Sequence, residues 1–178
     1  MMVKRKEKRQ MKNIDPRELT DNFFEAVGKE WMLVTAGTKE KFNMMTASWG
    51  CIGWLWNKPV AVAFIRPERF THAIIEQQER LTLSFLGDSQ EMRKVYSICG
   101  SKSGRDCDKV KETGLHPVET QGGSMTFEEA RLTLVCRKLY KDTLKEGNFV
   151  DKDLMQWYGE KGGYHDVYVL EIEECLVR

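Results

Sequence analysis

The chain has 178 residues, which is enough for one domain with a buried core. Hydrophobic residues make up 41% of the chain and charged residues 31%, which is ordinary for a soluble globular protein. The formal net charge is +1, so the chain lacks the broad basic field that is typical of nucleic-acid-binding proteins.

The start of the chain is the one basic stretch, with Lys4-Arg5-Lys6 followed by Lys8 and Arg9. We expect residues 1–15 to form a mobile, solvated N-terminus. No neighbouring apolar run has the length of a signal peptide or a membrane span. We therefore expect a single domain over residues 16–178, with neither nucleic acid nor membrane as a partner.

Five cysteines are present, an odd number without a C-x-x-C motif, and the three histidines do not complete metal-ligand spacings with them. This pattern argues against a metal site. It fits reduced thiols in a cytoplasmic protein. The residues are Cys51, Cys99, Cys107, Cys136 and Cys175, with His72, His116 and His165.

The first predicted elements are a short helix and a hairpin. Asp21 is placed to cap a helix that runs through residues 23–27. Residues 31–36 predict a strand, residues 37–41 a turn, and residues 43–50 a returning antiparallel strand.

The returning strand, N-M-M-T-A-S-W-G, combines small polar groups with a tryptophan. Thr46 and Ser48 point to one face of an extended strand, and Asn43, Met45, Ala47 and Trp49 point to the other. Gly50 lets a backbone or a ligand come close. Small donors beside a large flat side chain suit a flat, heteroatom-rich ligand, although an edge strand explains the same alternation.

The next stretch predicts a loop, a strand and a charged turn. Residues 54–59 predict a loop whose Trp54 and Trp56 suit packing or a dimer contact. Residues 60–65 predict a strand that is buried on both faces. Thr71 is placed to cap a helix over residues 73–78.

Arg66, Arg69 and Thr71 lie at the start of this helix and suit an anion site, because guanidinium groups and free N–H groups would meet there. A surface turn with two solvated arginines is the alternative.

The second half predicts a strand at residues 81–86 and a helix that Ser89 caps and that ends near Gly100. Residues 101–109 read S-K-S-G-R-D-C-D-K and suit a polar arm over a phosphate or a ribityl chain. Asp106 is placed to start a short helix that Gly114 ends. A P-loop pattern is absent, which argues against nucleotide triphosphate binding.

The C-terminal part predicts two long strands. They cover residues 128–140 and 164–177, with a helical turn at residues 151–157 and a turn at Gly162-Gly163 between them. Antiparallel links with short helices predict a mainly β fold, a small barrel with helical decoration. The chain lacks G-x-G-x-x-G after a strand, so a Rossmann fold is excluded.

Four spaced motifs together resemble the flavin reductase-like family with the FMN-binding split barrel, most of all its flavoredoxin-type branch. They are N-M-M-T-A-S-W-G at 43–50, N-K-P-V-A-V at 57–62, R-P-E-R-F-T at 66–71 and C-G-S-K-S-G-R-D-C-D-K at 99–109. The likeness runs from about Trp31 to the C-terminus, in the family's order. It implies an antiparallel split barrel of Greek-key type.

The resemblance also implies a homodimer with one non-covalent FMN per subunit near the interface. Along the flavin ring it places Asn43, Thr46, Ser48 and main-chain groups of the same strand, which includes Met45 and Ala47, with Trp49 packed at the ring. At the phosphate and ribityl chain it places Arg66, Arg69 and Thr71, with Ser103, Arg105 and Lys109 closing over them. It places His165 near the flavin.

The chemistry belongs to the FMN, so no catalytic side chain is expected. The resemblance implies an NAD(P)H-dependent flavin reductase. A flavoredoxin-like protein that passes electrons between bound FMN and a redox partner is the alternative. A binding module without turnover is a third reading.

Overall fold

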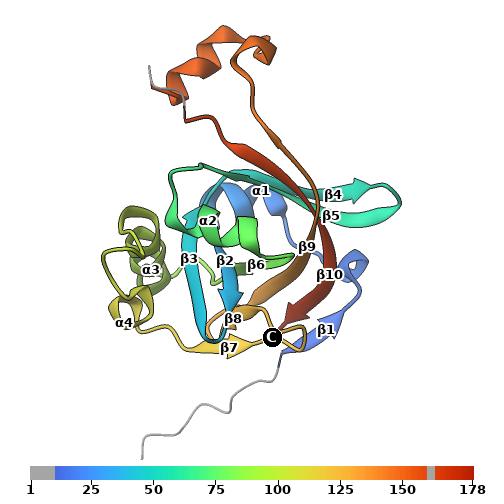
Figure 1. Cartoon of the computed structure of the whole chain (residues 1–178). Coiled ribbons are helices and arrows are strands. Elements are labelled where there is room, and N and C mark those ends of the chain that lie inside the picture. Colours follow the sequence, from blue (N-terminus) through green and yellow to red (C-terminus); the bar gives the residue numbers. More distant parts are fainter. Residues whose placement is uncertain (1–10, 160–162) are drawn as a thin grey trace, which may run out of the picture.

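The computed structural model describes residues 11–159 and 163–178, and its central feature is one curled antiparallel sheet (Figure 1). Eight strands form this sheet in the order β3-β2-β6-β9-β10-β5-β4, with β1 paired to β10. The fold class is mainly β, as the sequence predicts. The strands are β1 Lys12–Ile14, β2 Met32–Thr38, β3 Lys41–Ala47, β4 Gly50–Leu55, β5 Lys58–Ile65, β6 Arg80–Phe85, β9 Leu132–Thr143 and β10 Asp166–Val177.

The sheet curls because its longest strands bend. The pairing of β10 with β9 shifts register between Val169 and Leu170 and again between Ile172 and Glu174. Such irregularities increase the local twist of a strand and turn a sheet back on itself. The two ends of the sheet, β3 and the β4–β5 pair, are thereby brought towards each other (Figure 1).

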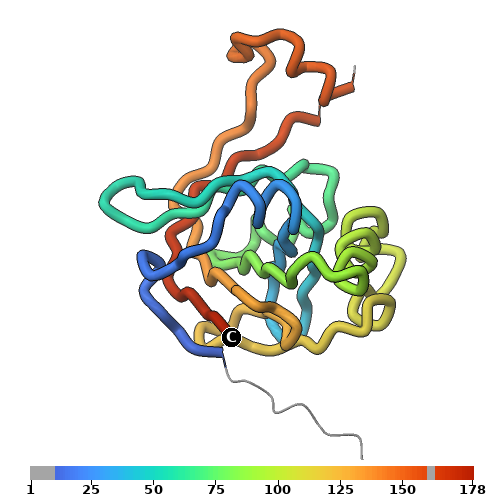
Figure 2. Tube along the Cα trace, turned by 180° about the vertical axis from the view of Figure 1, so that it is seen from behind, coloured from blue at the N-terminus to red at the C-terminus, as the bar shows by residue number. Residues whose placement is uncertain are grey.

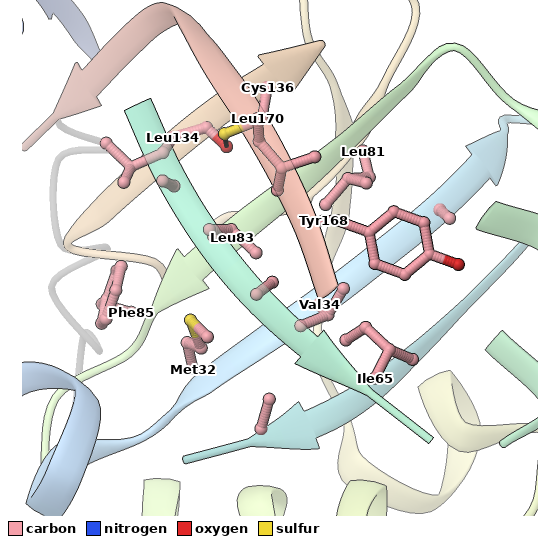
Figure 3. Packing of buried hydrophobic residues seen from close by; sticks show 14 of the residues in the cluster. Met32, Val34, Ile65, Leu81, Leu83, Phe85, Leu134, Cys136, Tyr168 and Leu170 are labelled. Atoms are coloured by element: carbon pink, nitrogen blue, oxygen red, sulfur yellow. Dashed lines mark hydrogen bonds between the residues drawn. The ribbon is translucent and has the colours of Figure 1, made fainter. Parts of the chain in front are cut away.

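The barrel interior is filled by alternate side chains of these strands. Leu81, Leu83 and Phe85 point inward from β6, two residues apart, as a strand requires. Figure 3 shows them with Leu134 and Tyr168 around one common interior. Burying each such side chain contributes about 1.5–3 kcal/mol to folding, so this interior is the main source of stability.

Helices cover the outside and one end of the barrel. They are α1 Phe23–Glu25, α2 Phe70–Gln77, α3 Gln90–Ser101 and α4 Lys109–Thr113. α2 adds Ile74 and Ile75 to the barrel interior. α3 packs Val95 and Tyr96 with Met44 of β3 in a second cluster. Both helices therefore contact β3, and they carry residues beside its end.

The predicted start of the first helix is wrong by one residue. Asn22, and not Asp21, caps α1, because its side chain accepts a hydrogen bond from the main-chain N–H of Phe24 at 3.1 Å. The Asp21 carboxylate instead lies 2.6 Å from Arg131, across the barrel end. Asp and Asn are equally good N-caps, and here Asp21 is engaged in a long-range ion pair instead.

The next two helices confirm most of the capping prediction. Ser89 caps α3 by accepting from the Met92 N–H, and α3 ends one residue beyond Gly100. Asp108, and not Asp106, caps α4, while Gly114 ends it in the left-handed conformation at φ 71°. Both aspartates suit an N-cap, so sequence alone did not separate them.

The stretch 43–50 is not one strand. β3 ends at Ala47, Ser48 and Trp49 form a break, and Gly50 begins β4. The predicted close approach at Gly50 is confirmed, because a Cβ there would lie 2.7 Å from the carbonyl oxygen of Val62.

The predicted loop at 54–59 is instead the tip of the β4–β5 hairpin. Trp54 lies on β4, and the two turn residues Trp56 and Asn57 have φ of 50° and 61°. Two positive φ values are the mark of a type I′ turn, whose twist matches the strands that it joins. β5 is buried on one face, whereas Val62 and Phe64 on the other are only half-buried, so burial on both faces was wrong.

The C-terminal strands project beyond the barrel as an arm (Figures 1 and 2). β9 begins at Leu132 and not near residue 128. Before it lies a small antiparallel pair that was not predicted from the sequence, β7 Pro117–Glu119 and β8 Met125–Phe127. The arm carries short 3-10 helices at Glu146–Asn148 and Lys152–Trp157. The second 3-10 helix confirms the predicted helical turn at residues 151–157. Gly162, in the predicted Gly162-Gly163 turn, lies outside the described residues.

The N-terminal segment pairs with the barrel from Lys12 onward. β1 runs antiparallel to the end of β10, with Lys12 opposite Val177. This strand was not expected, since the sequence there is polar. Residues 1–10 lie outside the described part of the chain.

Candidate functional site

A cavity of about 230 Å³ lies where the two ends of the sheet approach each other. β3 is an edge strand in the described sheet, so main-chain groups that the neighbouring strand does not pair lie on its outer side. Phe64 of β5 also lines this cavity. We call this the first cavity, and its lining residues are Met45, Thr46, Ala47, Ser48, Trp49, Phe64, Arg66, Arg69, Trp157 and His165.

A second cavity, of about 140 Å³, adjoins the first at Arg69. The start of α2 and the loop after α3 enclose it. Its lining residues are Asn43, Glu68, Arg69, Phe70, Thr71, Gly100, Ser101, Lys102, Ser103, Gly104, Arg105 and Lys109.

The start of α2 gives the second cavity its positive character. Arg69 occupies the N-cap position without a side-chain cap bond, so free N–H groups of the first helical turn face this region. Thr71 lies inside that turn, and its predicted role as the cap is wrong. Burial lowers the pKa of Arg69, but a guanidinium stays charged. The cavity thus combines a helix N-terminus with a fixed cation.

Asn43 connects β3 with α2 and with the loop after α3 at the base of the second cavity. Its side-chain nitrogen donates to the Thr71 hydroxyl at 2.8 Å, and the residue is 6% exposed. A Cβ on Gly104 would lie 2.2 Å from the Asn43 side-chain oxygen. Only glycine therefore lets the loop after α3 approach β3 and α2 this closely.

Lys109 is buried below this loop, with 4% of its surface exposed. Its ammonium group donates to the carbonyl oxygens of Met44 and Cys99, both at 2.9 Å. Burial lowers its pKa. Lys109 thus fastens β3 to the end of α3 and supplies positive charge from behind the cavity.

The rim of the second cavity is the loop with Ser103 and Arg105. The Ser103 hydroxyl accepts a hydrogen bond from the Arg105 main-chain N–H at 3.2 Å. The Arg105 guanidinium lies 5.0 Å from the centre of the Phe70 ring. Arg105 is exposed, so its guanidinium is open to a ligand at the rim.

The structure brings all twelve predicted site residues to these two adjoining cavities. The first holds Met45, Thr46, Ala47, Ser48, Trp49 and Arg66, the second holds Asn43, Thr71, Ser103, Arg105 and Lys109, and Arg69 lines both. Arg66 was grouped with Thr71 but lies in the first cavity. The Thr46 hydroxyl is occupied, since it donates to the Tyr96 carbonyl at 2.6 Å.

The arm supplies an aromatic wall to the first cavity. The Trp157 ring stands edge-on to Trp49 at 5.7 Å, and Arg66 donates to the Trp157 carbonyl at 2.7 Å. The Arg66 guanidinium also lies 5.3 Å from the Tyr158 ring. The sequence did not single out Phe64 or Trp157, because neither belongs to a polar motif.

His165 completes this wall as a neutral group. It is 7% exposed, its ring lies 4.9 Å from Trp49, and its Nδ1 is 2.9 Å from the Tyr158 hydroxyl. Burial, together with the positive charge of Arg66, lowers the pKa of His165 to about 4. Near neutral pH the imidazole is therefore uncharged.

An ion network anchors β10 directly after His165. The Asp166 carboxylate lies 2.7 Å from Nε2 of His72 and 2.9 Å from the Lys141 ammonium, and Lys141 lies 2.7 Å from Glu76. Although His72, Glu76 and Asp166 are spaced for a metal, the ammonium already provides the cation. Burial raises the pKa of Asp166, but bonds from Thr143, His72 and Lys141 outweigh this and leave it lowered.

Residues 24–178 match the flavin reductase like domain. The chain belongs to the flavin reductase-like family. The match covers every described residue of both cavities. No curated protein sequence matches the chain at a significant level.

Solved structures share the split-barrel fold of this flavin reductase-like chain. Flavoredoxin from Methanosarcina acetivorans is 21% identical with a TM-score of 0.63, over 84% of this chain and 68% of that one. An FMN-binding protein from Thermus thermophilus with bound p-hydroxybenzaldehyde is 20% identical with a TM-score of 0.63, over 94% and 82%. Nitrilotriacetate monooxygenase component B from Bacillus cereus is 16% identical with a TM-score of 0.63, over 92% and 80%.

The described helices of the flavin reductase-like chain are all too short or too polar to cross a membrane.

Proposed function

We propose that this flavin reductase-like protein binds FMN non-covalently and transfers electrons from NAD(P)H to it. The junction of the two cavities at Arg69 carries this proposal. One cavity has an aromatic wall and an open strand edge, and the other has a helix N-terminus and a cation. A planar heteroaromatic ring with a phosphate on a flexible chain matches both ends of this pair.

The hydrogen-bonding groups of the first cavity suit a flavin ring. The edge of β3 and the break at Ser48 offer main-chain groups to the ring's polar atoms, and Trp49 and Trp157 offer flat apolar surface. The phosphate fits the second cavity, where Arg69, the first turn of α2 and the Ser103 hydroxyl converge. When bound, FMN would supply the redox chemistry.

The protein's own side chains would orient the ring and limit water. Arg66 holds Trp157 against Trp49 through its bond to the Trp157 carbonyl. His165 stays uncharged beside them, so it adds no positive charge next to the ring near neutral pH. None of the lining groups has to accept a proton as a general base, which agrees with chemistry that resides in the cofactor.

We also propose a homodimer formed through the β4–β5 hairpin. Trp54 and Trp56 are each 56% exposed, and Trp56 stands 6.4 Å from the ring of Tyr140, which is also exposed. Large aromatic groups gathered on one surface are typical of interfaces. Trp56→Glu should convert a dimer to a monomer in light scattering, with Phe24→Glu, another exposed aromatic residue, as control.

A flavoredoxin-like electron-transfer protein is the second candidate. Trp49 and Trp157 are exposed at the mouth of the first cavity, so a redox protein could approach the flavin edge without a bound nicotinamide. Reduction of bound FMN by a low-potential redox protein, combined with no reaction with NADH or NADPH, would favour this candidate.

The decisive experiment starts with an FMN titration followed by flavin fluorescence. The FMN-loaded protein is then mixed anaerobically with NADH or NADPH, and the oxidised flavin absorbance is recorded. Bleaching with either donor supports the reductase. Protein that leaves FMN fluorescence unchanged would refute every flavin reading.

A further inference from the structure

A third cavity, of about 400 Å³, opens beside the other two and is assigned to no part of FMN. It shares Thr46, Ser48 and Arg69 with the first cavity, so its contents lie against the stretch proposed for the flavin ring. Its other lining residues are Trp31, Arg93, Tyr96, Ser97 and Gly100.

One face of α3 builds a wall of this cavity. Arg93, Tyr96, Ser97 and Gly100 follow the spacing i, i+3, i+4 and i+7, which places them along one side of a helix. Tyr96 is fully buried, and its hydroxyl accepts a hydrogen bond from the Leu86 N–H at 2.8 Å. The wall is therefore firmly anchored. Ser97 is exposed, and Arg93 is half-buried, with its guanidinium donating to the Glu30 carbonyl oxygen at 3.5 Å.

A tryptophan in a strained conformation lines the cavity beside this helix face, with the Trp31 ring 6.3 Å from the Tyr96 ring. Trp31 has φ 75° and ψ 174°, a region that is almost restricted to glycine. A π-helical turn, Ala26–Glu30, leads directly into it. π-helical turns and strained non-glycine residues are both rare, and both occur preferentially at functional sites.

Long-range contacts hold this strained segment in place. The Glu30 carboxylate accepts hydrogen bonds from Arg131 at 2.5 Å and from the Gly87 N–H at 2.5 Å. The Trp31 N–H donates to the Ala26 carbonyl at 2.9 Å. The fold thus holds the Trp31 backbone in its strained conformation, with the residue lining the cavity.

The chemistry of the cavity is aromatic and positive. The Arg93 guanidinium lies 5.1 Å from the Trp31 ring, and Arg69 provides a second cation. The described lining residues include no acidic group, and the nearby Glu30 carboxylate is engaged with Arg131 and Gly87. Such a site favours a planar ring that carries an anionic group.

We propose that this cavity binds the phosphoadenosine half of NADPH and that Arg93 makes the protein prefer NADPH to NADH. The inference rests on the proposed function, since it places the reductant next to the proposed flavin ring. The adenine would stack at Trp31 and Arg93, and the additional phosphate would pair with the Arg93 guanidinium. A second FMN, bound as a free substrate, presents the same ring-and-phosphate chemistry.

The test measures binding of adenosine 2′,5′-bisphosphate by calorimetry, with and without FMN. We expect Arg93→Gln to weaken this probe about tenfold or more, as loss of a charge-assisted bond requires. Ser97→Glu, an exposed position that adds a like charge to the phosphate, should weaken it as well. Lys94→Gln, an exposed lysine on the same helix but outside the cavity, is the matched control and should change the affinity less than about twofold.

The same variants are then compared in steady-state reduction. Arg93→Gln should raise KM for NADPH about tenfold while KM for NADH and the affinity for FMN stay within about twofold. The proposal is overturned if wild-type protein does not bind the probe, if Arg93→Gln binds it equally well, or if Arg93→Gln loses FMN instead. Binding of two FMN per chain that displaces the probe would assign the cavity to free flavin and overturn it too.

Failure of the proposed function gives a different signal. Protein that binds no FMN, or FMN that no dinucleotide bleaches, is recognised from the flavin spectrum. The probe titration on FMN-free protein reads the third cavity independently of that spectrum.

Discussion

Protonation of His165 should cost this protein stability as the pH falls from about 7 to about 5. The pKa of His165 is about 4 in the folded chain, against 6.5 for an exposed histidine, because burial and the charge of Arg66 disfavour the imidazolium. The unfolded chain therefore takes up the proton first. The stabilisation is complete above the unfolded pKa and is lost as the pH falls towards the folded pKa.

The size of the effect follows from these two pKa values. At about pH 5 nearly all unfolded chains carry the proton and few folded chains do, so the free energy of unfolding drops by about 2 kcal/mol relative to about pH 7. About a third of this drop has appeared at about pH 6, and the rest comes between about pH 6 and about pH 5.

Urea unfolding of wild type and His165→Gln at both pH values measures this term. Glutamine can still bond to the Tyr158 hydroxyl but does not titrate, so the variant should lose about 2 kcal/mol less than wild type on acidification. Equal losses in wild type and His165→Gln would show that His165 is not held neutral and would refute the reasoning.

Three further changes test the site and the core. Gly104→Ala should destabilise the protein by about 1–3 kcal/mol in urea unfolding, because the new Cβ would lie 2.2 Å from the Asn43 oxygen; Gly147→Ala, with open space around its Cβ, should be near neutral. Arg69→Ala should weaken FMN binding by about 1.5–3 kcal/mol in a fluorescence titration, whereas riboflavin, which lacks the phosphate, should bind with little change. Leu83→Ala should lower the free energy of unfolding by about 2–5 kcal/mol, since Leu83 is fully buried in the barrel and a cavity would remain.

Local sequence signals predicted the elements whose causes are local. Ser89 begins α3 and Gly114 ends α4, as predicted, because a capping hydroxyl and a left-handed glycine act within a few residues. The β2–β3 hairpin formed at its predicted turn. The prediction of Asp21 as a cap was wrong, because its ion pair with Arg131 joins residues that are far apart in the chain.

The break at Ser48 and Trp49 shows the same limit for strands. The alternating pattern of residues 43–50 suits one strand, but the sheet closes only if β3 and β4 separate there. The hairpin turn at Trp56 and Asn57 was missed for a different reason. Two tryptophans in a loop suggested packing or a dimer contact, and not a tight turn.

The motif residues of the candidate site were determined by the sequence itself. Polar and basic side chains at 43–49, 66–71 and 103–109 suited a ligand surface, but an edge strand and a solvated turn explained the first two stretches as well. The resemblance to the flavin reductase-like family supplied the full set. All twelve predicted site residues line the two adjoining cavities. The fold decided which of the two cavities each residue lines. Arg66, for example, was predicted beside Thr71 but lines the first cavity.

Only the tertiary structure decided the aromatic wall, the neutral state of His165 and the third cavity. Trp157 reaches the site because β9 and β10 extend into an arm, and His165 is neutral because that arm buries it beside Arg66. Trp31 and Arg93 meet because a strained turn and a helix face converge from separate parts of the chain. Sequence periodicity reports which side of an element is buried, whereas the distance between two elements depends on how the whole chain packs.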